Sequence, residues 1–280
     1  MRSKGQGASK LRADRDLTFL NRDEVRGVRL ELDFLKPDIY LRNAGVEHTI
    51  VVFGGTRIVA PDVADRNLLQ LQREGRADEA DVAVAARLKI AEQVSRKAIY
   101  YDIAREFGAI VGRAGGGPSD CRVTLLTGGG PGIMEAANRG AFDVGAKNIG
   151  LNIALPNEQH VNPYVSDDLC FTVRYFAIRK LHFLLRAKAL VNFPGGFGTL
   201  DELFETLTLV QTRTIDPLPI ILVGEAFWQQ AINLDFLIDE GVIDAKDRDL
   251  FSYAESAQDA WEQICHWHEA AGNPLFCDDS

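Results

Sequence analysis

The sequence predicts an α/β fold, in which one doubly wound parallel sheet of six or seven strands is covered by helices on both faces. Past residue 48, short β-branched apolar runs alternate with stretches of helical periodicity, which is typical of βαβ units. Glycine-rich turns follow three of these runs. With 46% hydrophobic and 25% charged residues, the 280-residue chain has enough apolar side chains for a large core.

The individual elements follow from these patterns. The predicted strands are Thr49–Phe53, Val123–Leu126, Ile149–Ala154, Leu169–Val173, Ala189–Phe193 and Pro219–Val223, with a seventh near Leu250–Tyr253. The predicted helices are Glu79–Phe107, which should stop at Gly108, then Gly132–Gly145, Tyr175–Lys188, Thr199–Thr212, Ala226–Glu240 and Glu255–Ala271. Because the connections are short and no change of composition divides them, residues 49–280 are expected to form a single Rossmann-like domain.

Residues 1–48 form a predicted N-terminal extension whose role the sequence does not indicate. The first ten residues are rich in Gly, Ser and Lys, which predicts disorder. The charged stretch that follows, to about Asn43, is expected to form a short helix on the outside of the domain.

Charge and cysteine content exclude several classes of function. A net charge of −9 argues against a nucleic-acid surface, because duplex binding needs clustered Lys and Arg. Hydrophobic runs fall short of the roughly 20 residues that span a membrane. The four cysteines contain no C-x-x-C pair, which suits reduced thiols better than disulfides or zinc. We therefore expect a cytoplasmic protein without nucleic-acid or membrane partners.

The most informative segment is VNFPGGFGTLDE at residues 191–202, where an apolar strand leads through a glycine-rich turn into a helix. Gly195, Gly196 and Gly198 allow the backbone to approach an anion, and Thr199 is expected at the helix N-cap. Free N–H groups and the helix dipole would then meet at one point, which predicts a phosphate site. Glu202 either completes a capping box with Thr199 or faces the ligand.

The glycine-rich turns do not match better-known nucleotide loops. The Pro194–Glu202 turn lacks the Gly-Lys-Ser/Thr of a P-loop, and Asp201 replaces the third glycine of a dinucleotide fingerprint. Similar turns occur at Gly54–Arg57 and Thr127–Gly132. Since the carboxyl ends of parallel strands meet at one edge, the three turns should face the same crevice and form a nucleotide pocket.

A basic cluster precedes the fifth predicted strand. In and just after RYFAIRKLH, residues 174–182, the side chains of Phe176, Leu181 and Leu184 are expected to face the core, and His182 to pack there. Arg179 and Lys180 form either a solvated face or a pair of cations near a bound anion. A single carboxylate such as Glu202 beside an arginine suits a reaction with a cationic, oxocarbenium-like transition state.

These residues carry a resemblance to a known family. PGGFGTLDE resembles the PGGxGTxxE motif of the LOG (Lonely Guy) nucleoside 5′-monophosphate phosphoribohydrolases, and the Arg179-Lys180 pair falls where that family has its Arg-Lys pair. GGGPGIMEAANRGA at 128–141 and FGGTR at 53–57 are similar to two further family segments. The likeness spans roughly residues 49–270 and implies a Rossmann-like fold, a homodimer or higher oligomer, and cleavage of a nucleotide's N-glycosidic bond to free base and ribose 5-phosphate.

The resemblance also implies roles for individual residues. Arg179 and Glu202 correspond to the catalytic pair. Substrate contacts are expected from Gly54, Gly55, Gly129, Gly130, Met134, Lys180, Gly195, Gly196, Gly198 and Thr199. Neither a metal nor a cofactor is implied. The resemblance implies either an AMP-like substrate or a cytokinin riboside monophosphate. It does not decide between them, because Phe176-Ala177-Ile178 departs from the Met and acidic residue that the family often carries before its Arg-Lys pair.

Two alternatives compete with the hydrolase. A non-catalytic carrier of a nucleotide or of molybdenum cofactor would need the phosphate site but not an Arg–Glu pair, so the presence of both residues favours the enzyme. A lysine decarboxylase would need pyridoxal phosphate on a lysine such as Lys180, whose neighbours include no apparent partner for the pyridinium nitrogen.

Overall fold

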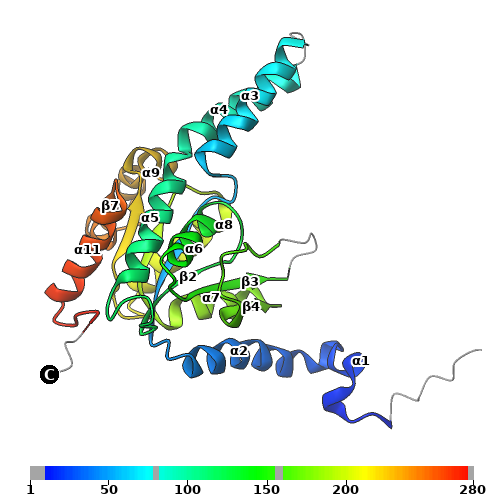
Figure 1. Cartoon of the computed structure of the whole chain (residues 1–280). Helices are drawn as coiled ribbons and strands as arrows, with labels where there is room; N and C mark the ends of the chain where they lie inside the picture. The colour runs from blue at the N-terminus through cyan, green and yellow to red at the C-terminus, as the bar shows by residue number, and fades with distance from the viewer. Residues whose placement is uncertain (1–9, 78–81, 155–159, 277–280) are drawn as a thin grey trace, which may run out of the picture.

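In the computed structural model, residues 10–77, 82–154 and 160–276 are described, and within them seven parallel strands form one sheet (Figure 1). The strands are β1 (His48–Phe53), β2 (Val123–Thr127), β3 (Asn148–Ile153), β4 (Cys170–Val173), β5 (Ala187–Asn192), β6 (Ile220–Val223) and β7 (Ser252–Ala254). Their order across the sheet is β4-β3-β2-β1-β5-β6-β7. The predicted strands, including the seventh, are confirmed to within a few residues at their ends.

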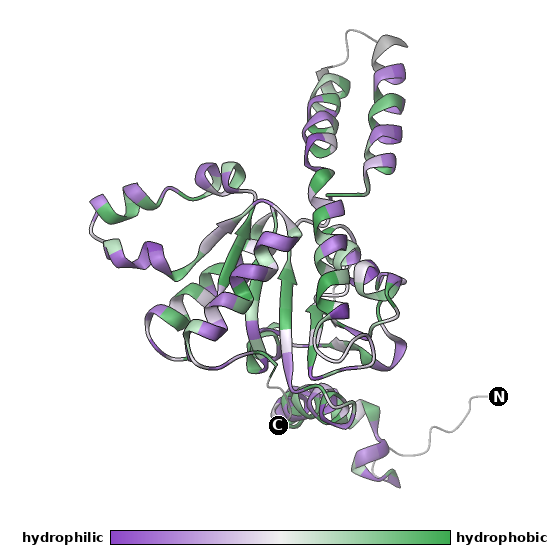
Figure 2. Cartoon of the chain, turned by 60° about the vertical axis from the view of Figure 1, so that its left-hand side comes forward, coloured by the Kyte–Doolittle hydropathy of each residue, from purple (hydrophilic) through white to green (hydrophobic). Residues whose placement is uncertain are grey.

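Both faces of the sheet are covered, as the doubly wound prediction requires. Along β1, Ile50 and Val52 pack on one face, and Val51 and Phe53 pack on the other. The first face is covered by α5 (Ile99–Arg113), α6 (Ile133–Asp143) and α11 (Ala257–Ala270), and the second by α7 (Phe176–Leu185), α8 (Phe197–Gln211) and α9 (Glu225–Ala231). Figure 2 shows the hydrophobic strands between helices whose outer faces are largely hydrophilic.

The order of the strands reverses direction at β1. Chain segments β2 to β4 extend the sheet to one side of β1, while β5 to β7 extend it to the other. Strand β1 pairs directly with β5, with Val52 opposite Val191 and Phe53 opposite Asn192. In open parallel sheets, the crevice beyond such a reversal is where ligands bind. Both the first glycine turn and the Pro194–Glu202 turn begin at this point.

The region between β1 and β2 differs from the prediction of one helix over Glu79–Phe107. The structure instead has α3 (Pro61–Ala77) and α4 (Val82–Lys97), which form a hairpin that projects from the domain (Figure 1), and α5, which begins after a turn at Ala98. Residues 78–81 lie outside the described ranges. The sequence prediction missed α3 although its apolar residues recur with helical spacing, because the helix is polar overall.

Gly108 does not end a helix, contrary to the prediction. It lies inside α5, where an added Cβ would come 2.0 Å from the Ala137 carbonyl oxygen of α6. At Gly140 of α6, an added Cβ would come 1.8 Å from the Arg105 carbonyl oxygen of α5. The two helices cross so closely that each needs a glycine at the contact, and this packing outweighs glycine's cost in helix propensity.

Other boundaries also changed. The expected Ala226–Glu240 helix is divided into α9 and α10 (Leu234–Asp239), because Ile232 is extended and the Asn233 side chain caps α10. The expected short helix of the extension is α2 (Arg26–Asn43), with 18 residues. The remaining helical pieces are α1 (Leu17–Leu20) and short turns of 3₁₀ helix at Ala13–Arg15, Asp23–Val25, Asp167–Leu169 and Ala245–Leu250.

Some sequence expectations concern residues that the structure does not describe. Residues 1–9, nearly all of the segment predicted to be disordered, and Cys277 lie outside the described ranges. Cys121, Cys170 and Cys265 are free thiols. Across the described ranges, the helices are all too short or too polar to cross a bilayer.

The helix crossing gives a test of the fold. We expect Gly108→Ala to lower the free energy of unfolding by at least about 2 kcal/mol, because its methyl group would push α6 away from α5. Gly27→Ala is the matched control, since an added Cβ at this helical glycine meets no atom within 4 Å. Urea unfolding followed by circular dichroism measures both. Equal stability of the two variants would contradict the proposed close contact.

Candidate active site

The three glycine-rich turns meet at the carboxyl edge of the sheet, as the sequence predicts. The Gly55 N–H donates to the Pro194 carbonyl at 2.9 Å, and the Ile133 N–H donates to the Gly55 carbonyl at 3.2 Å. Beside these turns lies a cavity of about 300 Å³. Of the residues predicted to form the site, its lining includes Gly54, Gly55, Met134, Arg179, Gly196, Gly198, Thr199 and Glu202.

Glycine is required where the turns touch. An added Cβ at Gly54 would lie 2.5 Å from Cγ2 of Ile133, and one at Gly132 would lie 2.4 Å from the Gly55 carbonyl oxygen. Gly132 also has a φ of +74°, which favours glycine. The backbone of Gly132 therefore packs directly on that of Gly55 and Thr56, and the backbone of Gly54 on the Ile133 side chain, which fixes the wall of the cavity.

The start of α8 suits an anion, although not in the way the sequence indicated. The helix begins at Phe197 with Gly196 as N-cap, so Thr199 is its third residue and is buried rather than capping. The capping-box interpretation of Glu202 is therefore wrong. Because the N-cap is glycine, no side chain caps the first turn, which also contains no acidic residue. Open space beside Gly196 and Gly198 leaves the first N–H groups accessible to a ligand.

Glu202 lies on the second turn of α8, and its carboxyl group is unusually sheltered. The residue is only 6% exposed, and burial raises the pKa of this carboxyl group to about 7. Lys180 and Arg179 oppose the rise, while Glu205 and Asp201 add to it. A carboxylate that is neutralised so easily in a ligand-sized cavity is typical of a functional site.

Lys180 holds three carboxylates together. Its ammonium lies 2.9 Å from Asp201, 2.8 Å from Glu205 and 3.8 Å from Glu202. Burial lowers the pKa of Lys180, but its hydrogen bonds to Glu205 and Asp201 and the nearby negative charges outweigh this effect, so the pKa of Lys180 is raised overall. Lys180 of α7 thus binds α8 through ion pairs, and it does not line the cavity. Within the described residues, no group of three or more acidic, His or Cys side chains is arranged to hold a metal.

Arg179 enters the cavity from α7. Its Nε donates to the Leu151 carbonyl at 2.9 Å and its Nη2 to the Gly128 carbonyl at 3.3 Å, and the guanidinium lies over the Phe183 ring. Burial lowers the pKa of Arg179, and the charge of Glu202 opposes that shift. Backbone carbonyls therefore fix the arginine, and the second glycine turn contributes one of them.

In the second glycine turn, the carbonyl groups of Gly129 and Gly130 accept hydrogen bonds from another part of the chain. The Asn162 backbone N–H donates to the Gly129 carbonyl at 2.8 Å, and the Asn162 side chain donates to the Gly130 carbonyl at 3.0 Å. The Asn162 side chain also donates to Asn138, which is fully buried. Gly195 packs against the Thr199 side chain. Gly129, Gly130, Gly195 and Lys180 do not line the cavity, and substrate contact stays a prediction for these and for the lining residues alike.

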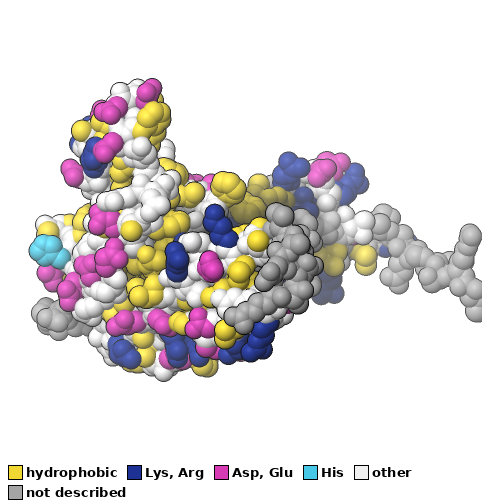
Figure 3. Space-filling model, turned by 90° about the horizontal axis from the view of Figure 1, so that it is seen from above, with side chains coloured by type: hydrophobic (Ala, Val, Ile, Leu, Met, Phe, Trp, Pro, Cys, Tyr) yellow, Lys and Arg dark blue, Asp and Glu magenta, His cyan; other side chains and the backbone are white. Residues whose placement is uncertain are grey.

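Sequence reasoning missed part of the lining. The cavity is also lined by Phe53, Thr56, Ile153, Phe176, Phe197 and Asp201. Phe176 and Leu181 were expected in the core but are 52% and 46% exposed, because α7 presents that side to solvent, whereas His182 is buried as expected. Phe197, 93% exposed at the cavity mouth, could have been suspected as an aromatic residue between two glycines. Figure 3 shows hydrophobic, basic and acidic side chains together on the face seen from above.

A second, larger cavity lies elsewhere. It measures about 500 Å³ and is formed mostly by the α3–α4 hairpin, with Arg57 and Arg87 among its lining residues. It contains neither the helix start nor the buried carboxylate of the smaller cavity. The smaller cavity is therefore the candidate active site.

Comparison with known proteins agrees with the motif. A protein-family model described as "Possible lysine decarboxylase" matches residues 134–264. A cytokinin riboside 5′-monophosphate phosphoribohydrolase of Arabidopsis thaliana is 28% identical over 176 residues, which cover 60% of this chain and 76% of that protein. The enzyme LOG of Oryza sativa is 29% identical over 169 residues, covering 59% and 65% of the two chains.

Solved structures give a weaker likeness. A molybdenum cofactor carrier protein from Chlamydomonas reinhardtii aligns with 81% of this chain and 99% of its own, at 20% identity and a TM-score of 0.45. A molybdenum cofactor binding protein from Rippkaea orientalis covers 59% of this chain and 85% of its own, at 21% identity and a TM-score of 0.40. The likeness thus depends on the sequence comparisons, which show that the chain is similar to the LOG phosphoribohydrolases.

Proposed function

We propose that the protein hydrolyses the N-glycosidic bond of a nucleoside 5′-monophosphate. In this reaction the bond between C1′ and the base nitrogen breaks, water supplies a hydroxyl group to C1′ and a proton to the base, and free base and ribose 5-phosphate result. The observation that carries the proposal is the presence of buried Glu202 and the uncapped start of α8 in one cavity. Relatives named as cytokinin riboside 5′-monophosphate phosphoribohydrolases support it.

The proposed mechanism gives each group one task. The 5′-phosphate binds the N–H groups at the start of α8, where Gly196 and Gly198 leave room for it. Glu202, one turn further along the helix, faces the ribose. As a carboxylate it stabilises the positive charge that develops at C1′ and orients the attacking water. Arg179 lies beside the leaving base and assists its departure.

The substrate is proposed to be an ordinary mononucleotide such as AMP, or a cytokinin riboside monophosphate. Phe176 and Phe197 at the mouth of the cavity offer apolar surface to a flat base. We also infer that the protein works in the cytoplasm as a homodimer or higher oligomer. The exposed Leu181, Leu185 and Phe204 on α7 and α8 support self-association, because they form apolar surface near the cavity.

The first test measures base release. Wild type and Glu202→Gln are incubated with AMP, GMP, CMP, UMP and isopentenyladenosine monophosphate, and free base and ribose 5-phosphate are followed by chromatography. We expect the wild type to cleave at least one of them and the variant to be at least about 100-fold slower, because the neutral amide cannot stabilise the cation.

The matched control is Glu205→Gln, which also removes a partner of Lys180 but leaves the cavity lining intact. It should stay within about fivefold of wild type. Nucleotide binding without release of base by the wild type would instead favour the carrier function.

The pH dependence of the reaction tests the role of Glu202 separately. Since burial raises its pKa to about 7, the carboxylate form is depleted below that pH. We expect kcat/KM to fall about tenfold per pH unit below about pH 7 and to level off above it. A fall of kcat/KM towards high pH would instead make Glu202 a general acid.

A second variant distinguishes the ionisation of Glu202 from that of the substrate's phosphate group, whose second pKa lies near 6. Lys180 lowers the pKa of Glu202, so Lys180→Gln should move the midpoint of the pH profile upward. An unmoved midpoint would assign the ionisation to the substrate.

The raised pKa of Glu202 should also affect the free energy of unfolding, which gives a test that does not depend on activity. The folded-state pKa of Glu202 is raised, so the contribution of this group to stability is greatest below its unfolded-state pKa and is lost as pH rises towards about 7. We expect Glu202→Gln to unfold with a higher free energy than wild type at about pH 8, by up to about 3 kcal/mol, and to lose this advantage near about pH 5. Urea unfolding at the two pH values measures the difference. An advantage that does not change with pH would argue against the buried charge.

A further inference from the structure

Helix α2 of the N-terminal extension lies against α7, the helix that carries Arg179 and Lys180 (Figure 1). In the core, α7 is anchored by Phe183, which is fully buried. The side chains of Arg179 and Lys180 also bind the Leu151 and Gly128 carbonyls and the carboxylates of α8, but these long side chains leave the backbone of α7 to be held by other contacts. The contacts with α2 occur at the beginning, the middle and the end of α7.

The beginning of α7 is capped by a residue from α2. The N-cap residue Tyr175 makes no side-chain cap of its own. Instead, the Asp33 carboxylate accepts hydrogen bonds from the backbone N–H groups of Arg174 at 2.7 Å and Tyr175 at 3.1 Å. Arg29, one turn earlier on α2, donates to the Tyr175 hydroxyl at 3.0 Å. A carboxylate placed at the positive end of a helix dipole stabilises that helix end in a defined position.

Two further contacts follow along α7. His182 is buried, stacks on the Phe34 ring with centroids 5.1 Å apart, and pairs through Nε2 with the Phe34 carbonyl at 3.0 Å. At the end of the helix, Arg186 pairs with Asp38 and holds the pKa of that carboxyl group below its usual value. Helix α2 therefore fixes α7 at three separated points.

We propose that α2 is a positioning element for the active site, and that Asp33 is a positioning residue that sets the place of Arg179 and Lys180 through the N-terminus of α7. This proposal rests on the proposed hydrolase function for its kinetic consequence. Its structural part, that Asp33 holds α7 in place, does not depend on that function. The phosphate site lies on α8 and the glycine turns, so α2 acts on the catalytic groups without touching the phosphate.

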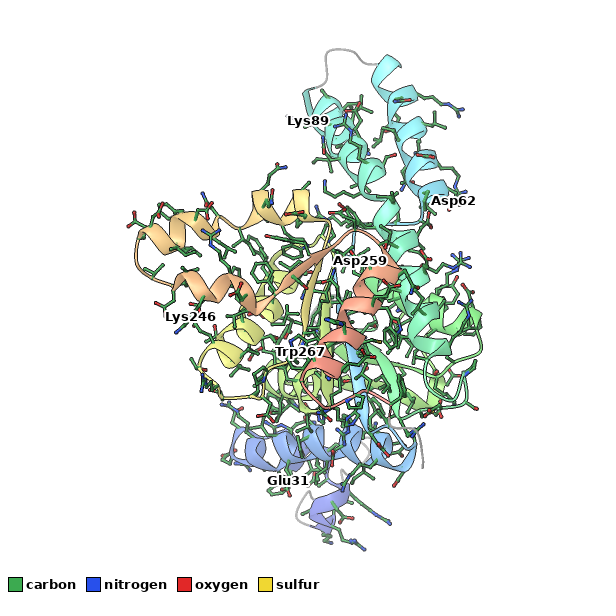
Figure 4. The ribbon with its side chains drawn as sticks, turned by 90° about the vertical axis from the view of Figure 1, so that its left-hand side faces the viewer. Glu31, Asp62, Lys89, Lys246, Asp259 and Trp267 are labelled. Carbon is green, nitrogen blue, oxygen red and sulfur yellow. The ribbon has the colours of Figure 1, made fainter. Side chains whose placement is uncertain are left out.

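The test compares Asp33→Ala with Asp33→Asn and Glu31→Ala. Asparagine keeps an oxygen that can accept from the two N–H groups, whereas alanine removes the cap. Glu31 is the matched control, because it is an exposed carboxylate of the same helix that lies on its outward side (Figure 4). Kinetics are measured with the nucleotide that the wild type cleaves, and backbone hydrogen exchange is measured on the full chain without substrate.

For Asp33→Ala, we expect kcat to fall about tenfold while KM changes less than about twofold, because a misplaced catalytic group slows the reaction without weakening the phosphate site. Amide exchange should become faster in residues 174–185 and stay unchanged in α8. Asp33→Asn should recover most of the rate, and Glu31→Ala should match wild type in both measurements.

A milder variant keeps the test valid if Asp33→Ala folds poorly. Tyr175→Phe removes only the hydroxyl that Arg29 binds, and it should lower kcat by about twofold to threefold with the same local rise in exchange. The proposal is overturned if Asp33→Ala retains both wild-type kcat and wild-type exchange in α7. It is equally overturned if exchange rises throughout the domain in both variants, because α2 would then serve folding alone. A wild type that cleaves no nucleotide would sink the hydrolase function, whereas local exchange in α7 would still decide whether Asp33 positions that helix.

Discussion

The candidate site depends on the close approach of three glycine-rich turns at the point where the order of the strands reverses across the sheet. Gly55 is bonded to Pro194 on one side and to Ile133 on the other, so the ends of β1, β2 and β5 are joined without any side chain between them. A Cβ at Gly54 or Gly132 would separate the turns. Because the turns are held in this way, α6 and α8 begin at fixed places, and the cavity between them exists before any ligand arrives.

The carboxyl group of Glu202 carries the main electrostatic cost of this arrangement. Its burial removes water that would otherwise stabilise the charge, and Lys180 restores only part of that stabilisation from 3.8 Å away. Lys180 is itself shared with Asp201 and Glu205, so it cannot neutralise Glu202 completely. A carboxylate held in this state gains most when a positive charge develops next to it, which is the demand of a glycosidic transition state.

The sequence predicts the parts of the structure that local patterns determine. The seven strands and the common crevice of the turns follow from apolar runs and glycine positions, which each segment carries by itself. The Thr199–Glu202 spacing suggested a capping box with Thr199 as N-cap, but the N-cap is Gly196, three residues earlier, because a glycine turn can supply an uncapped start. Gly108 was misjudged because the reason for it lies in α6. The bonds between Asp33 and the start of α7 join residues more than 140 positions apart, and no periodicity records such a contact.

The two helix starts beside the cavity explain where an anion would bind. At α7, the carboxylate of Asp33 accepts from the N–H groups of Arg174 and of the N-cap residue Tyr175, so a negative charge already lies at the positive end of that helix. At α8, Gly196 provides no cap, the first turn has no acidic residue, and there is open space next to the backbone. A phosphate at the start of α7 would meet the like charge of Asp33, so of these two helix starts α8 is the one that favours an anion. The N-terminal extension thus has two effects through one residue, since Asp33 both fixes the helix that carries Arg179 and leaves α8 as the place for the substrate's charge.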